Sequence, residues 1–136
     1  MADGLIAAAL DLYHDAGWLG LGASLYLSLH SGAPSTTGAN ELSANGYARQ
    51  ACTIGASSSG TKTNANSINF GPATAQWSIL YYGLWTAVSG GTFLGYWTLR
   101  DSGGTVLGSA ATVPIDQLAR FAAGELDFVL ANEVVA

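Results

Sequence analysis

The sequence predicts an all-β protein: an antiparallel β-sandwich, jelly-roll-like or immunoglobulin-like, with one N-terminal helix. The first observation is a change in apolar period, from helical spacing over residues 3–16 to strict alternation after residue 23. The second is the regular recurrence of turns rich in glycine, serine and asparagine, which is typical of sandwiches and barrels. The third is the length of 136 residues, which suits a single domain with one core.

The helix is expected over residues 3–16. Asp3 is a suitable N-cap, because its carboxylate can accept a backbone N–H of the first turn. Gly17 supplies the stop. Apolar side chains recur at helical spacing between these two residues and form one stripe, which we expect to contact another subunit. The stripe residues expected at that contact are Leu5, Leu12 and Tyr13.

The rest of the chain alternates between short apolar runs and small polar residues, as expected for about eight strands joined by turns. We divide the chain into a helix with its linker, residues 1–22, and a β-sandwich domain, residues 23–136. Strands are expected at residues 24–30, 47–54, 67–70, 77–87, 92–100, 105–113, 118–122 and 125–130, with loops at 31–46 and 55–66.

The clearest element is a hairpin of residues 77–87 and 92–100 around a Val-Ser-Gly-Gly turn. Both faces of this hairpin are apolar, and a strand that is apolar on both faces must be covered on both. The other sheet can cover one face, and the helix or another subunit must cover the second. We therefore predict a homo-oligomer, with a trimer as the expected form. The hairpin residues expected at the subunit contact are Trp77, Tyr81, Trp85, Phe93, Tyr96 and Trp97.

The same aromatic cluster allows a second interpretation, a platform on which sugar rings stack. We favour core and subunit interface, where large rings supply much of the burial, because the hairpin is apolar on both faces.

Charged residues make up only 10% of the chain, against about 25% in an ordinary domain. The four Lys and Arg are widely spaced, so we expect no nucleic-acid partner. The chain has no run of ~20 apolar residues and no Lys or Arg ahead of its first apolar stretch, so we expect neither a membrane span nor a signal peptide. The single cysteine, Cys52, excludes an intrachain disulfide and is expected to be a buried small hydrophobe.

Three patterns resemble reactive sites, but none has the full arrangement that its chemistry needs. Residues 55–63 look like a phosphate-binding loop, yet no helix follows them. His14 and His30 lie on different elements without a nucleophile motif, and we expect one at the surface and the other hydrogen-bonded. Glu125 and Asp127 share a strand face, which we interpret as solvated. The sequence therefore predicts no catalytic residue, no cofactor and no metal site.

Seven short motifs, spread over nearly the whole chain, together resemble one family: small virion structural proteins of tailed bacteriophages, labelled phage tail fibre proteins. The motifs are LYLSLH (25–30), GANELS (38–43), GYARQ (46–50), NSINF (66–70), GLWTA (83–87), SGG (89–91) and RFAAGEL (120–126).

The resemblance implies a structural component of the virion, in a tail fibre, a head decoration or the base of a spike, that acts by protein–protein assembly without enzyme activity. It implies capsid or tail subunits as partners, assembly in the cytoplasm of the host bacterium, and residence in the virion. Among the motif residues, Glu41 and Arg49 flank a loop and are expected to pair across it, which would hold residues 31–46 in place. The alternative function is a carbohydrate-binding module that recognises glycans on the host surface.

Overall fold

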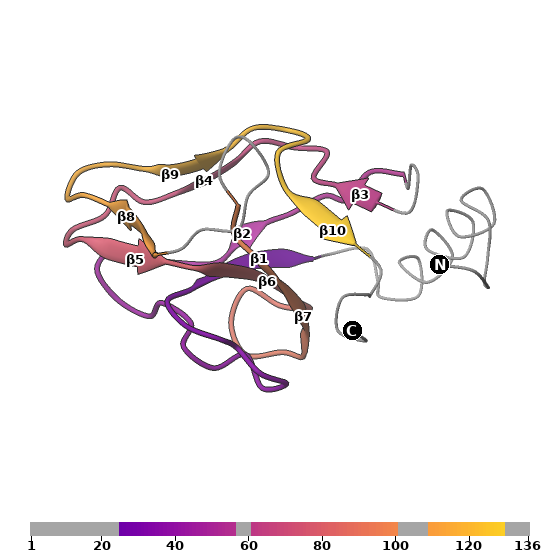
Figure 1. Cartoon of the computed structure of the whole chain (residues 1–136), viewed down its shortest axis with the longest axis horizontal. Coiled ribbons are helices and arrows are strands. Elements are labelled where there is room, and N and C mark those ends of the chain that lie inside the picture. The colour runs from indigo at the N-terminus through magenta and orange to yellow at the C-terminus, as the bar shows by residue number, and fades with distance from the viewer. Residues whose placement is uncertain (1–24, 57–60, 101–108, 130–136) are drawn as a thin grey trace.

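The computed structural model of the protein describes residues 25–56, 61–100 and 109–129 (Figure 1). This part of the chain is all-β and antiparallel, as predicted, and contains no helix long and apolar enough to cross a membrane. The helix expected over residues 3–16, with Leu5, Leu12 and Tyr13, lies outside the described residues. The strands are β1 Tyr26–His30, β2 Gln50–Ala51, β3 Thr61–Thr63, β4 Ile68–Phe70, β5 Trp77–Ile79, β6 Tyr81–Trp85, β7 Phe93–Thr98, β8 Ala111–Val113, β9 Ala119–Phe121 and β10 Asp127–Val129.

Four strands form one sheet in the order β2–β1–β6–β7, and the others form three antiparallel pairs, β3 with β10, β4 with β9, and β5 with β8. Figure 1 shows the β4–β9 pair along one side of the molecule and the β1–β6 strands along the other. The β5–β8 and β3–β10 pairs lie toward opposite ends of the same view. The strands therefore surround a shared interior.

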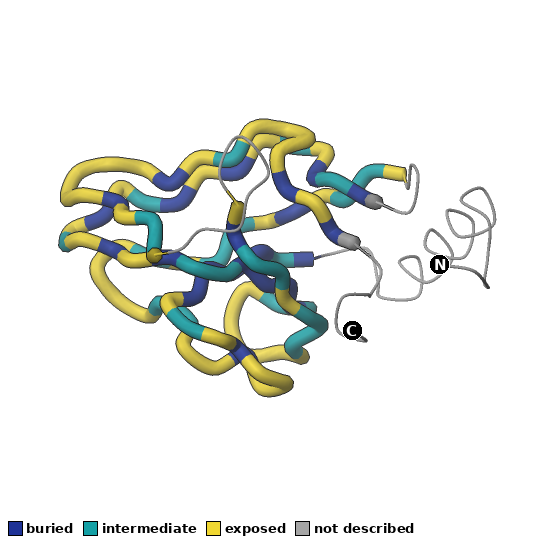
Figure 2. Tube along the Cα trace, in the orientation of Figure 1, coloured by how far each residue is buried: buried dark blue, intermediate teal, exposed yellow. Residues whose placement is uncertain are grey.

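One apolar core fills that interior, and strand alternation explains which side chains enter it. In β1, Leu27 and Leu29 are fully buried on one face, while Ser28 and His30 point to the other. Figure 2 shows the same alternation of buried and exposed positions along β4 and β9, with exposed loops around them. The core residues include Leu27, Leu29, Cys52, Ile68, Phe70, Trp77, Ile79, Tyr82, Leu84, Val113, Leu126 and Phe128.

The segment predicted as one strand over residues 77–87 is two strands that belong to different sheets, so that prediction is wrong. The break is at Leu80, whose N–H donates to the His30 carbonyl (2.8 Å) and whose carbonyl accepts from the Leu99 N–H (2.9 Å). As a result, β5 pairs with β8 and carries Trp77 into the core, while β6 continues into the four-stranded sheet. The apolar alternation runs on through the break and does not reveal it.

A second correction concerns residues 55–66, which were expected to be a loop. Thr61–Thr63 form β3, which pairs with β10. Next to it, the buried Asn64 side chain donates to the Ala122 carbonyl (2.9 Å) and accepts from the Leu126 N–H (2.9 Å). Strand β3 therefore consists of polar residues. It lacks the apolar alternation from which a strand is predicted.

Candidate functional site

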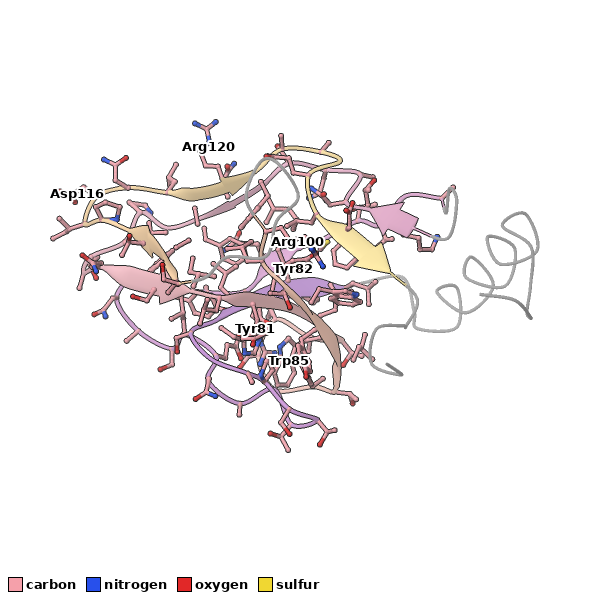
Figure 3. All side chains as sticks on the ribbon, viewed as in Figure 1. Tyr81, Tyr82, Trp85, Arg100, Asp116 and Arg120 are labelled. Atoms are coloured by element: carbon pink, nitrogen blue, oxygen red, sulfur yellow. The ribbon has the colours of Figure 1, made fainter. Side chains whose placement is uncertain are left out.

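The four-stranded sheet presents one face to the core and another away from it. Figure 3 shows Tyr82 on one side of β6 and Tyr81 and Trp85 on the other. We call the side away from the core the outer face. The strand registers assign to it Tyr26, Ser28, His30, Tyr81, Gly83, Trp85, Phe93, Tyr96 and Thr98.

A β-bulge decides which β7 side chains join the outer face. The ladder pairs Phe93 with Trp85 and skips Leu94. Phe93 therefore shares the outer face with Tyr96, and their rings are stacked with centroids 6.4 Å apart. Trp97 points to the core side instead. Strict alternation along residues 92–100 would place Phe93 and Trp97 on the same face of the sheet. The bulge shifts the alternation by one residue, so these two side chains lie on opposite faces.

Residues 31–49 fold back and cover part of the outer face. Gly38, with φ of +76°, lies so close to the Trp85 ring that a Cβ there would be 2.4 Å from Cζ2. Its neighbour Ala39 places its carbonyl oxygen 2.8 Å from His30 Nδ1. From the sequence we expected the N-terminal helix or another subunit to cover this face of the hairpin. In the structure, part of the cover comes from residues 31–49 of the same chain.

Arg49 holds this loop in place. Its Nε lies 2.8 Å from Glu41 Oε2 and its Nη2 lies 2.9 Å from Glu41 Oε1, so the structure brings the expected pair together in a bidentate contact. Its Nη1 donates to the carbonyls of Ala87 (2.9 Å) and Gly90 (2.8 Å), in the turn between β6 and β7. The guanidinium carbon lies 3.6 Å from the Trp85 ring centroid, within cation–π range. One side chain therefore joins the loop, the turn and the outer face.

Tyr47 extends the Arg49 cluster toward the core. Its hydroxyl donates to Glu41 Oε2 (2.7 Å) and accepts from the Leu29 N–H (3.2 Å), while its ring stacks with Phe70. Burial alone raises the pKa of Glu41, but the hydrogen bonds from Arg49 and Tyr47 hold that pKa below its ordinary value. Burial and the Glu41 hydrogen bond raise the pKa of Tyr47 well above its ordinary value. At neutral pH the cluster therefore contains one carboxylate, one guanidinium and one neutral phenol.

Beneath the loop, Ser28 and His30 form a buried hydrogen-bond network with Trp85. Because His30 Nδ1 faces the Ala39 carbonyl, its proton is on Nδ1, and Nε2 accepts from the Ser28 hydroxyl at 2.7 Å. The Ser28 oxygen in turn accepts from Trp85 Nε1 at 3.0 Å. A serine next to a histidine can form a nucleophile–base pair, but both residues here have no exposed surface. The network satisfies buried polar groups and offers no access to a substrate.

The stability of the protein should decrease on acidification below pH 7, because His30 is buried in its neutral form. Burial lowers the pKa of His30, and the Ala39 hydrogen bond and the Glu41 charge oppose that shift. In the unfolded chain the pKa is about 6.5, so below that pH the unfolded state binds a proton that the folded state does not. We expect the free energy of unfolding to fall by up to about 1.4 kcal/mol per pH unit, from near 6.5 down to the folded pKa.

Urea unfolding of the wild type, His30→Gln and His14→Gln between pH 7.5 and 5 measures this slope. His30→Gln should flatten it and His14→Gln should retain most of it. The assignment to His30 is wrong if the slope persists in His30→Gln.

The exposed part of the outer face is aromatic. Tyr96 is 41% exposed, and Tyr81 and Phe93 are partly exposed around it. The Tyr81 and Tyr96 rings meet edge to face with centroids 5.7 Å apart. We call Tyr81, Phe93 and Tyr96 the aromatic patch, and it contains no charged side chain.

The remaining hairpin residues expected at a subunit contact lie elsewhere. Trp85 is on the outer face but is buried beneath the loop, with 8% of its surface exposed. Trp77 is in the core with 2% exposed, and its Nε1 donates to the Asn45 carbonyl (3.0 Å). Trp97 is half-buried on the core side, stacked on Tyr82. These three rings have little surface to offer a neighbour.

Other candidate residues do not assemble into a reactive site. Cys52 is buried, as predicted, and burial raises the pKa of its thiol to about 12, which makes the thiolate a minor species. Glu125 and Asp127 are exposed, as predicted, beside the buried Leu126 and Phe128. Across residues 25–56, 61–100 and 109–129, no three His, Cys, Asp or Glu side chains gather as metal ligands would.

Sequence reasoning missed the role of Gly38 and the Ser28–His30–Trp85 network. Gly38 lies within the GANELS motif, but its partner Trp85 is far along the chain, so no local pattern connects them. The only signal for the network in the sequence was that Ser28 and His30 alternate with Leu27 and Leu29, and therefore share the other face of their strand.

In a comparison with protein-family models, residues 1–127 match the family described as podophage GP4 fiber I protein gp80. No curated protein matches the chain. The matched range contains all the described strands except the last two residues of β10.

Proposed function

The chain belongs to the podophage GP4 fiber I protein gp80 family, and from that premise we propose that it serves as a non-enzymatic assembly subunit in a tail fibre, a head decoration or a spike base. Family membership itself makes it a phage fibre-type structural protein and a virion component. The match over residues 1–127 is the observation that carries the proposal. The proposed role includes assembly in the host cytoplasm and needs no catalytic residue or cofactor.

We propose that the aromatic patch is a contact surface for a neighbouring virion subunit. Aromatic residues are enriched in the cores of protein interfaces and charged residues are depleted there. The patch has both properties, and the loop held by Arg49 and Glu41 gives it a fixed border. The four-stranded sheet and the β4–β9 pair would then be the two layers of a β-sandwich, and the protein would act as a homo-oligomer. A trimer remains the expected form of that homo-oligomer.

Particles assembled with a Tyr81→Ser/Tyr96→Ser double variant should contain fewer copies of this protein than wild-type particles. The two changes remove aromatic surface from the patch while leaving the core and the Arg49 cluster intact. Quantitative mass spectrometry of purified particles gives the copy number. The matched control is Leu118→Ser, which removes an exposed apolar side chain (43% exposed) outside the patch. Full copy number in the double variant would contradict the role of the patch in assembly.

A second candidate function is recognition of a host-surface glycan, which the adjoining rings of Tyr81, Phe93 and Tyr96 favour, because aromatic faces can stack on sugar rings. This function predicts that the same double variant has a normal copy number while its particles adsorb poorly to the host. Quenching of protein fluorescence by host polysaccharide, lost in the double variant, is the direct measurement. The two functions therefore give opposite results in the particle experiment.

A further inference from the structure

The aromatic patch consists of three rings that are held in place and partly exposed. Phe93 packs against Trp85, with ring centroids 5.0 Å apart, and against His30 at 5.9 Å. The ring planes of Phe93 and Tyr96 are within 12° of parallel, whereas the Tyr81 ring meets that of Tyr96 at 80°. Rings that are already fixed lose little conformational entropy when a ligand covers them. The patch is therefore preorganised for a ligand that packs flat apolar surface against ring faces.

The polar groups of the patch are two phenol hydroxyls, those of Tyr81 and Tyr96. Among the described residues, no hydrogen-bond partner is found for either hydroxyl. The outer face around them has no amide and no carboxylate side chain. The Arg49 guanidinium nearby already donates to Glu41 and to two backbone carbonyls. The patch therefore suits a ligand that presents acceptors, and it offers few acceptors to a ligand that is rich in donors.

We propose that the aromatic patch binds a proline-rich segment of another protein in the polyproline II conformation. This helix has no internal hydrogen bonds, so its carbonyls are free to accept from the Tyr81 and Tyr96 hydroxyls. Proline has no N–H that would need an acceptor, and its ring packs on the faces of Phe93 and Tyr96. Proline-rich segments dock on aromatic surfaces in several recognition domains, because their conformation is preformed. The inference rests on the proposed role of the patch as a contact with a neighbouring virion subunit, and it names the chemistry of that neighbour.

The segment belongs to a different polypeptide, because this chain has no proline-rich run to offer. Its three prolines are Pro34, Pro72 and Pro114, and all of them lie in described residues. Pro34 is fully buried. Pro72 and Pro114 are single prolines in turns that Gln117 joins: its carbonyl accepts from the Ala73 N–H (2.9 Å), and its N–H donates to the Pro114 carbonyl (3.1 Å). A second copy of this chain therefore does not supply the segment.

Isothermal titration calorimetry of the isolated protein with decaproline tests the proposal. We expect the wild type to bind decaproline but not a glycine–serine peptide of the same length. Tyr81→Phe and Tyr96→Phe keep the rings and remove one donor each, so each should weaken binding about fivefold, the effect of one ordinary hydrogen bond. Tyr26→Phe is the matched control, because Tyr26 is on the same face but on the far side of Trp85 from Phe93, and it should leave the affinity unchanged.

Three results of this titration would overturn the proposal. The first is no binding of decaproline at millimolar concentration, and the second is equal binding of the glycine–serine peptide. The third is that Tyr81→Phe and Tyr96→Phe bind decaproline as tightly as the wild type. A glycan is the competing occupant, since sugar rings also stack on aromatic faces. Binding of host polysaccharide without binding of decaproline would assign the rings to a sugar and refute the proline-rich partner.

The titration and the particle experiment fail independently. Loss of copy number in Tyr81→Ser/Tyr96→Ser particles, together with no binding of decaproline, would keep the patch as a subunit contact and refute its proline-rich partner. Binding of decaproline together with a normal copy number would support the proline-rich partner and contradict only the role of the patch in assembly.

Discussion

Replacing Arg49 by alanine is expected to lower the free energy of unfolding by about 3 kcal/mol, the lower end of the range for breaking a buried ion pair. The side chains of Arg49 and Glu41 are only 9% and 17% exposed. Without Arg49, the Glu41 carboxylate would keep the Tyr47 hydroxyl as its only side-chain partner among the described residues. The carbonyls of Ala87 and Gly90 would also lose their guanidinium donor.

Urea denaturation of the purified variants measures this loss. Arg120→Ala is the matched control, because it makes the same chemical change at an exposed position on β9 and should alter stability by less than about 0.5 kcal/mol (Figure 3). Arg49→Lys should fall between the wild type and Arg49→Ala, since lysine keeps the charge but not the bidentate geometry. If Arg49→Ala lost less than about 1 kcal/mol, the pair would be acting as an ordinary surface salt bridge.

The local parts of the fold were predictable from the sequence. The expected strands at 24–30, 67–70 and 118–122 each contain an observed strand, because period-two alternation depends only on neighbouring residues. The β6–β7 hairpin was also found from its turn. The break at Leu80 and the bulge beside Trp85 were not found, because both depend on hydrogen bonds to other strands. Each of them changes which side chains face the core.

Part of the candidate site was also predictable from the sequence, and part was not. Glu41 and Arg49 are eight residues apart in two motifs that flank one loop, so their pairing could be expected from the sequence. The apolar second face of the hairpin was also recognised, but its cover was assigned to the helix or a neighbouring subunit. The segment that partly covers it is a loop of small polar residues, which no hydrophobic pattern distinguishes from solvent-exposed chain. Its fit depends on the contact between Gly38 and Trp85, which lies 47 positions further along the chain.

That contact leads to the second large effect: Gly38→Ala is expected to lower the free energy of unfolding by about 3 kcal/mol. The φ of +76° disfavours any residue with a Cβ, which contributes about 1–2 kcal/mol. The added methyl group would also lie 2.4 Å from Trp85 Cζ2 and 3.1 Å from Phe93 Cδ1, and overpacking of this kind contributes about 1–3 kcal/mol. Both rings are fixed by the sheet, so the loop must move away.

Gly90→Ala separates the two contributions to that loss. Gly90 has a similar φ of +65°, but nothing lies within 4 Å of the position its Cβ would take. It should therefore lose only the backbone contribution, about 1–2 kcal/mol. The difference between the two variants in urea denaturation gives the contribution of the contact with Trp85. In Gly38→Ala alone, a displaced loop should also change the tryptophan fluorescence of the folded state. Equal losses and unchanged fluorescence would show that the loop does not press on the Trp85 ring.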